Sequence, residues 1–236
     1  MNARRYTFKV LPTAIKGNEF FLSKSESEHC IQVLRLKKND NIFLIDGKGN
    51  GYNVAIDNPN PICVSGKILE AYKNYGENSF CIHLGIPVIK RNRFEFILEK
   101  ATEMGTQEIT PLNFDRCNKK EVNLERCEKI IIAAAKQCCR SQLPIIHSPI
   151  DLNQFFVSPK KQVIAGKINV ESTLTLLKLN PDIPINVIIG PEGDFSDREI
   201  DTMDKNKVLY FNLGNRRLRS ETAALNSIAI LNELYG

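Results

Sequence analysis

Two glycine-bearing segments in the last third of the chain combine residue types that could bind a ligand and move a proton. In the first, "VIIGPEGDFSDREI" (187–200), an apolar run ends in Gly190-Pro191-Glu192-Gly193. Glycine lets backbone approach a ligand where a Cβ would otherwise stand, and proline stiffens the turn. Ser196 and Glu199 have the spacing of a capping box, which predicts a helix N-terminus facing the same space. Taken alone, this pattern fits a tight strand–helix turn without a ligand at least as well.

The second segment, "NLGNRRLRSETAALNS" (212–227), also follows an apolar run and precedes a helical pattern. It places Gly214, three arginines and Glu221 within eight positions. Arginine binds anions in a bidentate manner and stacks on aromatic rings. Two such segments at strand ends indicate a site for a nucleotide-like ligand together with RNA.

Other common site patterns are missing from the sequence. No G-x-G-x-x-G opens a helix and no G-x4-G-K-[ST] is present, which disfavours a dinucleotide-binding oxidoreductase and a P-loop enzyme. "RSETA" is not a nucleophile elbow. The seven cysteines are odd in number and form no C-x-x-C pair, and the three histidines stand far apart. We therefore expect reduced thiols and no metal.

The elements that must position these segments begin at Phe80. Apolar runs alternate with helical patterns, which predicts an α/β fold with a mostly parallel sheet covered on both faces. The runs are "FCIHLGIPVI", "EITPLNF", "PIIHSPI", "QVIAGKI", "INVIIG" and "VLYFNLG". In such sheets ligands bind at the carboxyl ends of the strands, where both glycine-bearing segments lie.

Residues 1–73 have a different pattern, mostly of strands, with a hairpin over "NIFLIDGKGNGYNVAI" and one helix whose capping box is expected at Ser25 and Glu28. They hold 11 Lys/Arg against 7 Asp/Glu, a net charge of +4. This charge favours a module that anchors nucleic acid, although an ordinary basic surface explains it equally well. Glu70–Phe80 is the expected linker. Without a signal peptide or an apolar run of membrane-spanning length, we expect a cytoplasmic protein.

Together the two segments resemble the paired signature of the SPOUT-superfamily methyltransferases that modify N3 of a uridine in 16S ribosomal RNA. "IIGPEGDFSDREI" matches that family's I-G-P-E-G-G-F-S loop, and "LGNRRLRSETAAL" matches its L-G-x-R-I-L-R-x-E-T-A loop. "HCIQVLRLKKNDNIFLIDGKG" resembles the PUA-like RNA-binding domain of the family. The resemblance implies a PUA-like β-barrel domain over residues 1–73 and a SPOUT methyltransferase domain with a deep trefoil knot over residues 74–236.

The resemblance also implies a homodimer that binds S-adenosylmethionine and acts on 16S rRNA or the small ribosomal subunit. Arg219 would steady negative charge on the uracil carbonyls, and Glu221 would take the N3 proton or merely occupy the helix N-terminus. The implied RNA contacts are Arg4, Arg5, Arg35, Lys37, Lys38 and, reaching across the dimer, Arg140. The implied cofactor contacts are Gly166, Ile189, Gly190, Pro191, Glu192, Gly193, Leu213, Gly214, Leu218, Thr222 and Ala223.

Two positions depart from the family pattern. Asp194 replaces a glycine, and Arg217, which we expect to point to solvent or RNA, replaces an aliphatic residue. Asp194 keeps open a second function, a protein that binds ribosomal RNA without transferring methyl groups. A nicotinamide-dependent oxidoreductase fits the alternation of strands and helices but lacks its fingerprint.

Overall fold

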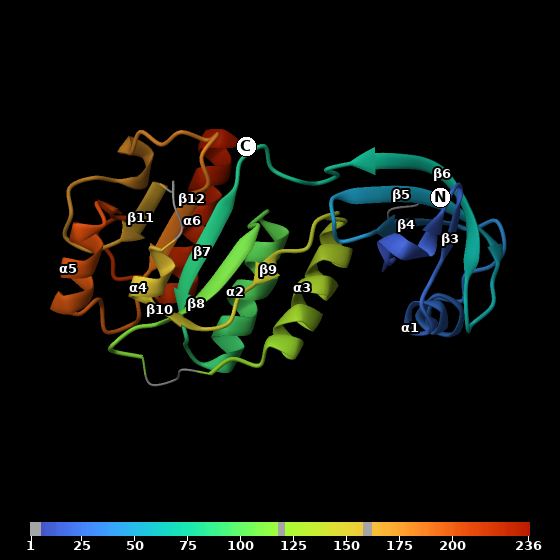
Figure 1. The fold of residues 1–236 in the computed structure, drawn as a ribbon, viewed down its shortest axis with the longest axis horizontal. Coiled ribbons are helices and arrows are strands. Elements are labelled where there is room, and N and C mark those ends of the chain that lie inside the picture. Colours follow the sequence, from blue (N-terminus) through green and yellow to red (C-terminus); the bar gives the residue numbers. More distant parts are fainter. Residues whose placement is uncertain (1–5, 118–120, 158–161) are drawn as a thin grey trace. The chain divides into compact units, whose positions relative to one another are not determined.

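The computed structural model describes residues 6–117, 121–157 and 162–236, and the chain packs as two units (Figure 1). The first unit takes in the described residues of Met1–Glu77 together with Ile132–Leu143, and the second those of Asn78–Ile131 and Pro144–Gly236. The functional boundary between residues 73 and 74 stays a prediction, because packing does not test which segment binds RNA. In the described part of the chain, no helix has both the length and the apolar character needed to cross a membrane.

The first unit contains a six-stranded sheet in the order β1-β4-β5-β6-β3-β2. Its long strands form the expected hairpin, in which Ile42 faces Val54 and Leu44 faces Tyr52. The alternating pattern buries Phe8, Ile42 and Leu44 in one core. The strands are β1 (Thr7–Lys9), β2 (Ile15–Lys16), β3 (Glu19–Phe21), β4 (Asn41–Ile45), β5 (Asn50–Asn58) and β6 (Ser65–Lys73), and the helical segments are η2 (Pro12–Ala14), α1 (Lys24–Glu28) and η3 (His29–Val33).

Two local predictions in this unit are wrong. The helix begins earlier than expected: Ser23 is the N-cap of α1, and its hydroxyl accepts a hydrogen bond from the backbone N–H of Glu26 at 3.4 Å. Both Ser23 and Ser25 precede an acidic residue by three positions, so the spacing alone could not choose between them. The linker is also shorter, because β6 pairs with β5 through Lys73.

The second unit contains a parallel sheet, as predicted, in the order β10-β8-β7-β12-β11-β13, with β9 also paired to β8. Its strands are β7 (Ile82–Pro87), β8 (Glu108–Asn113), β9 (Ile145–Ile146), β10 (Ile150–Asp151), β11 (Gln162–Gly166), β12 (Ile185–Ile189) and β13 (Leu209–Phe211). Its helical segments are α2 (Arg91–Glu103), α4 (Leu152–Phe155), η4 (Leu174–Leu176), α5 (Asp197–Lys205) and α6 (Ser220–Tyr235), and α3 (Leu124–Cys138) belongs to it as far as Ile131.

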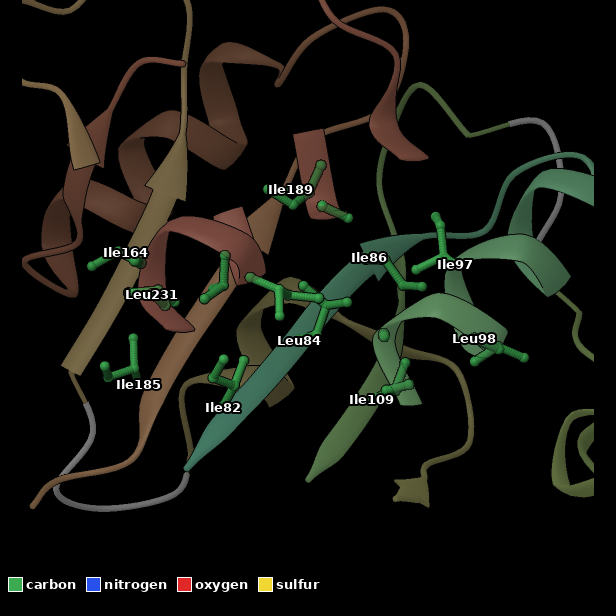
Figure 2. Close-up of a cluster of buried hydrophobic side chains, with 14 of the residues drawn as sticks. Ile82, Leu84, Ile86, Ile97, Leu98, Ile109, Ile164, Ile185, Ile189 and Leu231 are labelled. Atoms are coloured by element: carbon green, nitrogen blue, oxygen red, sulfur yellow. The ribbon is translucent and has the colours of Figure 1, made fainter. Parts of the chain in front are cut away.

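Helices cover both faces of this sheet, also as predicted. On one face Leu84 of β7 packs in a cluster with Leu98 of α2 and Leu231 of α6 (Figure 2). On the other face Ile188 of β12 packs with residues of α4 and α5. Because adjacent strand residues point to opposite faces, burial on both sides explains the nearly continuous apolar runs in the sequence. The sheet therefore holds the carboxyl ends of its strands rigidly at one edge.

Candidate active site

The carboxyl ends of β11, β12 and β13 meet around a hollow in the second unit. Parallel pairing of β11 with both β12 and β13 places these three ends at the same edge of the sheet. The space around the hollow is about 630 Å³, a figure that includes space open to solvent. The two segments singled out in the sequence supply most of its lining.

The structure brings together most of the predicted cofactor contacts. Those that line the hollow are Gly166, Ile189, Gly190, Pro191, Glu192, Leu213, Gly214, Leu218 and Ala223. Gly193 and Thr222 are not among its lining residues. Sequence reasoning missed Lys167, Ile168, Asp194, Phe211, Asn212, Arg216, Arg217 and Ser220, which also line it. All of these lie at or beyond the carboxyl ends of the same three strands, so the strand order of the sheet brings them together.

The loop after β12 owes its shape to Asp194 and Phe195. Asp194 has φ +64°, a left-handed conformation that asparagine and aspartate adopt more readily than other side chains. Its carboxylate accepts a hydrogen bond from the N–H of Phe195 at 2.8 Å, and its own N–H donates to the carbonyl of Pro191 at 3.0 Å. The aspartate is therefore accommodated at the position where the family pattern has glycine.

Gly190 lines the hollow, and its missing side chain also makes room for a buried ring. A Cβ built there would lie 3.0 Å from the ring of Phe195, which is buried in the core beneath the loop. The glycine therefore makes room for this ring and also forms part of the wall of the hollow. Gly214 has φ +99°, and a Cβ there would meet nothing within 4 Å.

The helix N-terminus expected after this loop is confirmed. Ser196 is the N-cap of α5, and it forms the capping box with Glu199. Glu199 also accepts a hydrogen bond from the backbone N–H of Asp115 at 2.7 Å, while the Ser196 hydroxyl donates to the Asp115 carboxylate at 2.6 Å. The start of α5 is thereby fastened to the segment that follows β8.

The two glycine-bearing loops are joined by direct hydrogen bonds. The hydroxyl of Ser220 donates to the carbonyl of Gly190 at 2.8 Å. The guanidinium of Arg217 donates to the carbonyl of Glu192, and the residue is exposed, so its expected orientation toward solvent or RNA stays a prediction. These contacts make the loops into one wall.

Arg93, which the sequence analysis overlooked, connects both loops to helix α2. Its guanidinium forms one ion pair with Glu192 and a second with Glu221, whose Oε1 lies 3.6 Å from Nε of Arg93. The Glu221 side chain is 13% exposed, and among the described residues its Oε2 has no hydrogen-bond partner. A buried acceptor left in this state is costly unless a ligand satisfies it. The arginines of "KRNRF" stand near the end of an apolar run in the sequence, but that position does not indicate which loops they contact.

Arg219 lies at the N-terminus of α6, the helix that also carries Glu221. It is the N-cap residue of α6, with an exposed side chain that has no hydrogen bond or ion pair within the described ranges. It is not part of the lining of the hollow. A free guanidinium beside the loops is available to an incoming substrate, and its catalytic role stays a prediction.

A second hollow lies near the start of α2 and is lined by Glu95, whose carboxylate is hydrogen-bonded to two arginines. Hydrogen bonds from Arg126 and Arg91 lower the pKa of Glu95 to about 2, so this group stays ionised at neutral pH. Both arginines pair with this one carboxylate, and we assign the cluster to the stability of the second unit.

The predicted RNA contacts of the N-terminal region are two groups of basic residues, and Arg140 is a separate case. Arg4 and Arg5 lie outside the described residues. Arg35, Lys37 and Lys38 are exposed after η3, as an RNA contact requires.

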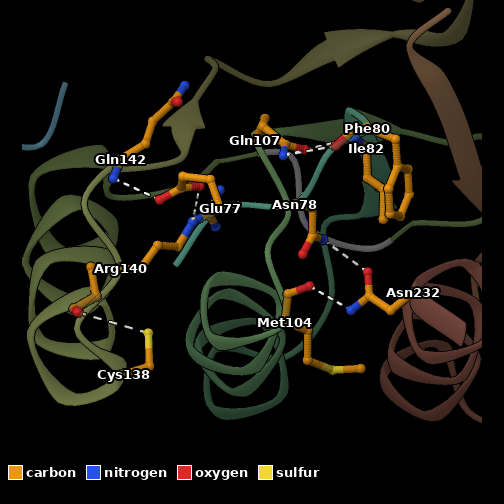
Figure 3. A network of polar contacts seen from close by, with 11 residues as sticks. Glu77, Asn78, Phe80, Ile82, Met104, Gln107, Cys138, Arg140, Gln142 and Asn232 are labelled. Atoms are coloured by element: carbon orange, nitrogen blue, oxygen red, sulfur yellow. Dashed lines mark hydrogen bonds and ion pairs between the residues drawn. The ribbon is translucent and has the colours of Figure 1, made fainter. Parts of the chain in front are cut away.

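The prediction that Arg140 contacts RNA or a partner's site is wrong. Its side chain is 2% exposed and forms an ion pair with Glu77 at 2.8 Å, and the same carboxylate accepts a hydrogen bond from the N–H of Gln142 (Figure 3). The burial of this ion pair within the first unit keeps the guanidinium from any outside partner. The sequence "CCRSQLP" contains no apolar periodicity that would have indicated such burial.

Comparisons with known proteins identify the class to which this fold and hollow belong. A family model for an RNA methyltransferase domain matches residues 76–232, and one for an RNA methyltransferase PUA domain matches residues 22–65. The Ribosomal RNA small subunit methyltransferase E of Buchnera aphidicola is 33% identical, over 93% of this chain and 90% of its own. The protein of that name from Mesomycoplasma hyopneumoniae is 32% identical, over 89% of this chain and 92% of its own.

A solved structure extends the likeness to the whole fold. The crystal structure of the Ribosomal RNA small subunit methyltransferase E from Neisseria gonorrhoeae, bound to S-adenosyl methionine, matches with a TM-score of 0.89 and 27% identity over 98% of both chains. The chain belongs to the ribosomal RNA small subunit methyltransferase E family. The resemblance seen in the two loops and the PUA-like N-terminal domain are thereby confirmed, and the oxidoreductase alternative is wrong.

Proposed function

We propose that this chain uses S-adenosylmethionine to methylate N3 of a uridine in 16S rRNA, and that the hollow at the carboxyl ends of β11, β12 and β13 holds the cofactor. One observation carries the proposal: the two loops that line this hollow are the segments that bear the family signature. Relatives over nearly the whole chain are named as ribosomal RNA small subunit methyltransferases. The gonococcal relative is bound to S-adenosyl methionine.

The residues present fit such a cofactor. The left-handed Gly214 leaves open space where a side chain would project, so the loop can accept a ligand against its backbone. Ile189, Leu213 and Leu218 supply apolar walls for an adenine ring, and neighbouring backbone groups are available to its edge. S-adenosylmethionine, when bound, supplies an electrophilic methyl group.

Side chains beside the hollow would supply the rest of the chemistry, and neither Glu221 nor Arg219 is among its lining residues. Uridine N3 carries a weakly acidic proton, which must leave as N3 is methylated, and negative charge develops on the uracil carbonyls. Glu221 has a buried Oε2 able to accept that proton, while Arg93 holds its Oε1. The exposed guanidinium of Arg219 would stabilise the negative charge that develops on the uracil carbonyl oxygens. Thr222 is exposed on the first turn of α6, where it can contact the base or the cofactor.

The wider setting of the reaction belongs to the same proposal. The substrate is 16S rRNA or the small ribosomal subunit, met in the cytoplasm, and Arg35, Lys37 and Lys38 contact its phosphates. The working form is a homodimer. A specific RNA is positioned by phosphate contacts and its base is taken out of the stack before chemistry.

A trefoil knot is part of the proposal, supported by the path of the chain after β13. The N–H of Asn212 donates to the carbonyl of Ser172 at 2.8 Å, so this segment runs beside the loop that follows β11. The chain then enters α6, which packs on η4, β7 and β12. This path, beside the 167–184 connection and then back to the middle of the sheet, is the observation that supports a knot.

Ala223→Leu tests the proposed cofactor site. Ala223 lines the hollow on the first turn of α6, and leucine preserves helix propensity while filling the space. We expect calorimetric binding of S-adenosylmethionine and methylation of 16S rRNA, followed by mass spectrometry, to fall together. Ala229→Leu, at an exposed position of the same helix, is the matched control and should leave both intact. Unchanged cofactor affinity in Ala223→Leu would remove the hollow from the proposal, and cofactor binding without any methylation by the wild type would favour the non-catalytic alternative.

A further inference from the structure

Three side chains at the opposite edge of the same sheet form a cluster suited to a metal ion. His83, Glu108 and His147 each offer a ligand atom, and these atoms all lie within 4.8 Å of one another. His83 is buried, and the side chains of Glu108 and His147 are 43% and 39% exposed. The cluster belongs entirely to the second unit.

Strand register explains why residues so distant in sequence meet. In the parallel pairing of β7 with β8, His83 lies directly beside Glu108, and Glu108 in turn lies beside Ile145 of β9. His147 is two residues beyond Ile145 and therefore on the same face of the sheet. These positions are at or near the amino ends of β7 and β8, away from the carboxyl-end hollow. Any role of the cluster is thus separate from cofactor binding.

The orientation of the side chains is already constrained by hydrogen bonds. A ring nitrogen of His83, Nε2, lies 2.7 Å from the Oγ1 of Thr110, a contact that fixes its imidazole on the sheet face. Nε2 of His147 lies 2.8 Å from Oε2 of Glu108. Histidine ligands in metal sites are commonly oriented by an outer contact of the kind that His83 makes with Thr110, whereas the contact of His147 with Glu108 brings two proposed ligands together.

We propose that His83, Glu108 and His147 bind a Zn²⁺ ion, with water completing the coordination. Two imidazoles and one carboxylate are a ligand set typical of zinc, and the partial exposure of Glu108 and His147 leaves an open side for water. Zinc–ligand bonds of about 2.0–2.1 Å put neighbouring ligands about 3.4 Å apart in a tetrahedron, so small rotations of exposed side chains suffice. The ion would clamp β7, β8 and β9 together at the amino edge of the sheet.

The experiment measures Zn²⁺ binding to metal-free protein by calorimetry and by the shift in melting temperature. Glu108→Gln and His147→Gln change exposed ligands, and each should weaken binding by at least about 10-fold and remove the thermal shift. His29→Gln is the matched control, because His29 is an exposed histidine of the other unit. Its affinity should equal that of the wild type. His83→Gln provides a third test if it folds, and the two variants at exposed ligands decide the outcome without it.

Cobalt substitution separates this site from the seven cysteines. Co²⁺ bound by imidazole and carboxylate lacks the intense near-ultraviolet band of cobalt–thiolate coordination. A one-to-one complex without that band, lost in His147→Gln, is the expected result. Equal affinity in wild type, Glu108→Gln and His147→Gln, a thiolate spectrum, or no binding above the level of weak surface association would each overturn the proposal and leave the cluster as a surface ion pair.

Discussion

Replacing Arg93 with methionine tests whether this arginine positions Glu221 for proton transfer. Methionine keeps much of the length of the side chain and removes the charge. Nε of Arg93 is 3.6 Å from Oε1 of Glu221, and the side chains are 23% and 13% exposed. Exposed ion pairs contribute about 0.2–1 kcal/mol, while breaking a buried one costs about 3–5 kcal/mol. This pair lies between those limits, so we expect a loss of roughly 1–3 kcal/mol in the free energy of unfolding.

The effect on rate should be larger than the effect on cofactor affinity. A catalytic group displaced by about 1 Å can lose on the order of 100-fold in rate, and this is the expected fall in single-turnover methylation. Arg93 does not line the hollow and reaches it only through its ion pair with Glu192, which is 59% exposed. Loss of such a pair should change cofactor affinity by less than about fivefold. Arg91→Met is the matched control, because Arg91 pairs with Glu95 instead.

A double-mutant cycle with Glu221→Gln decides between positioning and independent action. If Arg93 acts through Glu221, the double variant should be no slower than Glu221→Gln alone, because the group that Arg93 positions is already gone. Additive losses in rate would refute the reasoning, as would wild-type turnover by Arg93→Met. Thermal melts on all variants show whether each protein remains folded at the assay temperature.

Three further predictions concern a strained turn, a basic surface and the thiols. Asp194→Ala should lower the free energy of unfolding by about 1–2 kcal/mol, because alanine must adopt the same left-handed conformation without the hydrogen bond to Phe195. Asp194→Gly should lower it by less than about 0.5 kcal/mol, because glycine adopts this conformation without strain. Denaturant melts of the two variants and the wild type measure the difference. Neutralising Lys37 and Lys38 together should weaken binding to 16S rRNA and reduce the slope of log affinity against log salt concentration by up to about 2. The affinity for the cofactor should not change. An unchanged slope would exclude both lysines as phosphate contacts. Burial raises the pKa of the Cys127 thiol to about 11, so iodoacetamide at pH 8 should label the exposed Cys81 first, and peptide mass spectrometry showing rapid labelling of Cys127 in folded protein would contradict this burial.

The alternation of apolar runs and helical patterns was sufficient to predict the parallel sheet and its two covered faces. This signal is strong because each strand is buried on both sides and each helix has one apolar face. The strand-end loops were predicted for the same reason, since parallel strands bring their carboxyl ends to one edge. The other residues that line the hollow, such as Asn212 and Ser220, are brought there by the order of the strands in the sheet. That order cannot be read from periodicity.

Contacts between distant segments were the part that the sequence could not reveal. Arg140 and Arg93 are both arginines near strand or helix ends, yet one is buried against Glu77 and the other bridges two loops. Their surroundings are decided by packing between segments far apart in the chain, and single-residue patterns carry no record of it. Gly190 lines the hollow, but the second reason for a glycine there, the ring of Phe195 that packs where its Cβ would stand, could not be read from the sequence.

The histidines show how a fold changes the chemistry that a sequence suggests. Separated by 64 positions, His83 and His147 gave no indication of a metal, since motif spacing detects only ligands that lie close along one element. The parallel sheet aligns strands from remote parts of the chain, and its register places His83 and Glu108 side by side and brings His147, directly after β9, to the same face. The same alignment that gathers two loops around a hollow at the carboxyl edge thus gathers three ligand groups at the amino edge. A site on neighbouring parallel strands becomes visible only once the strand order and register are known.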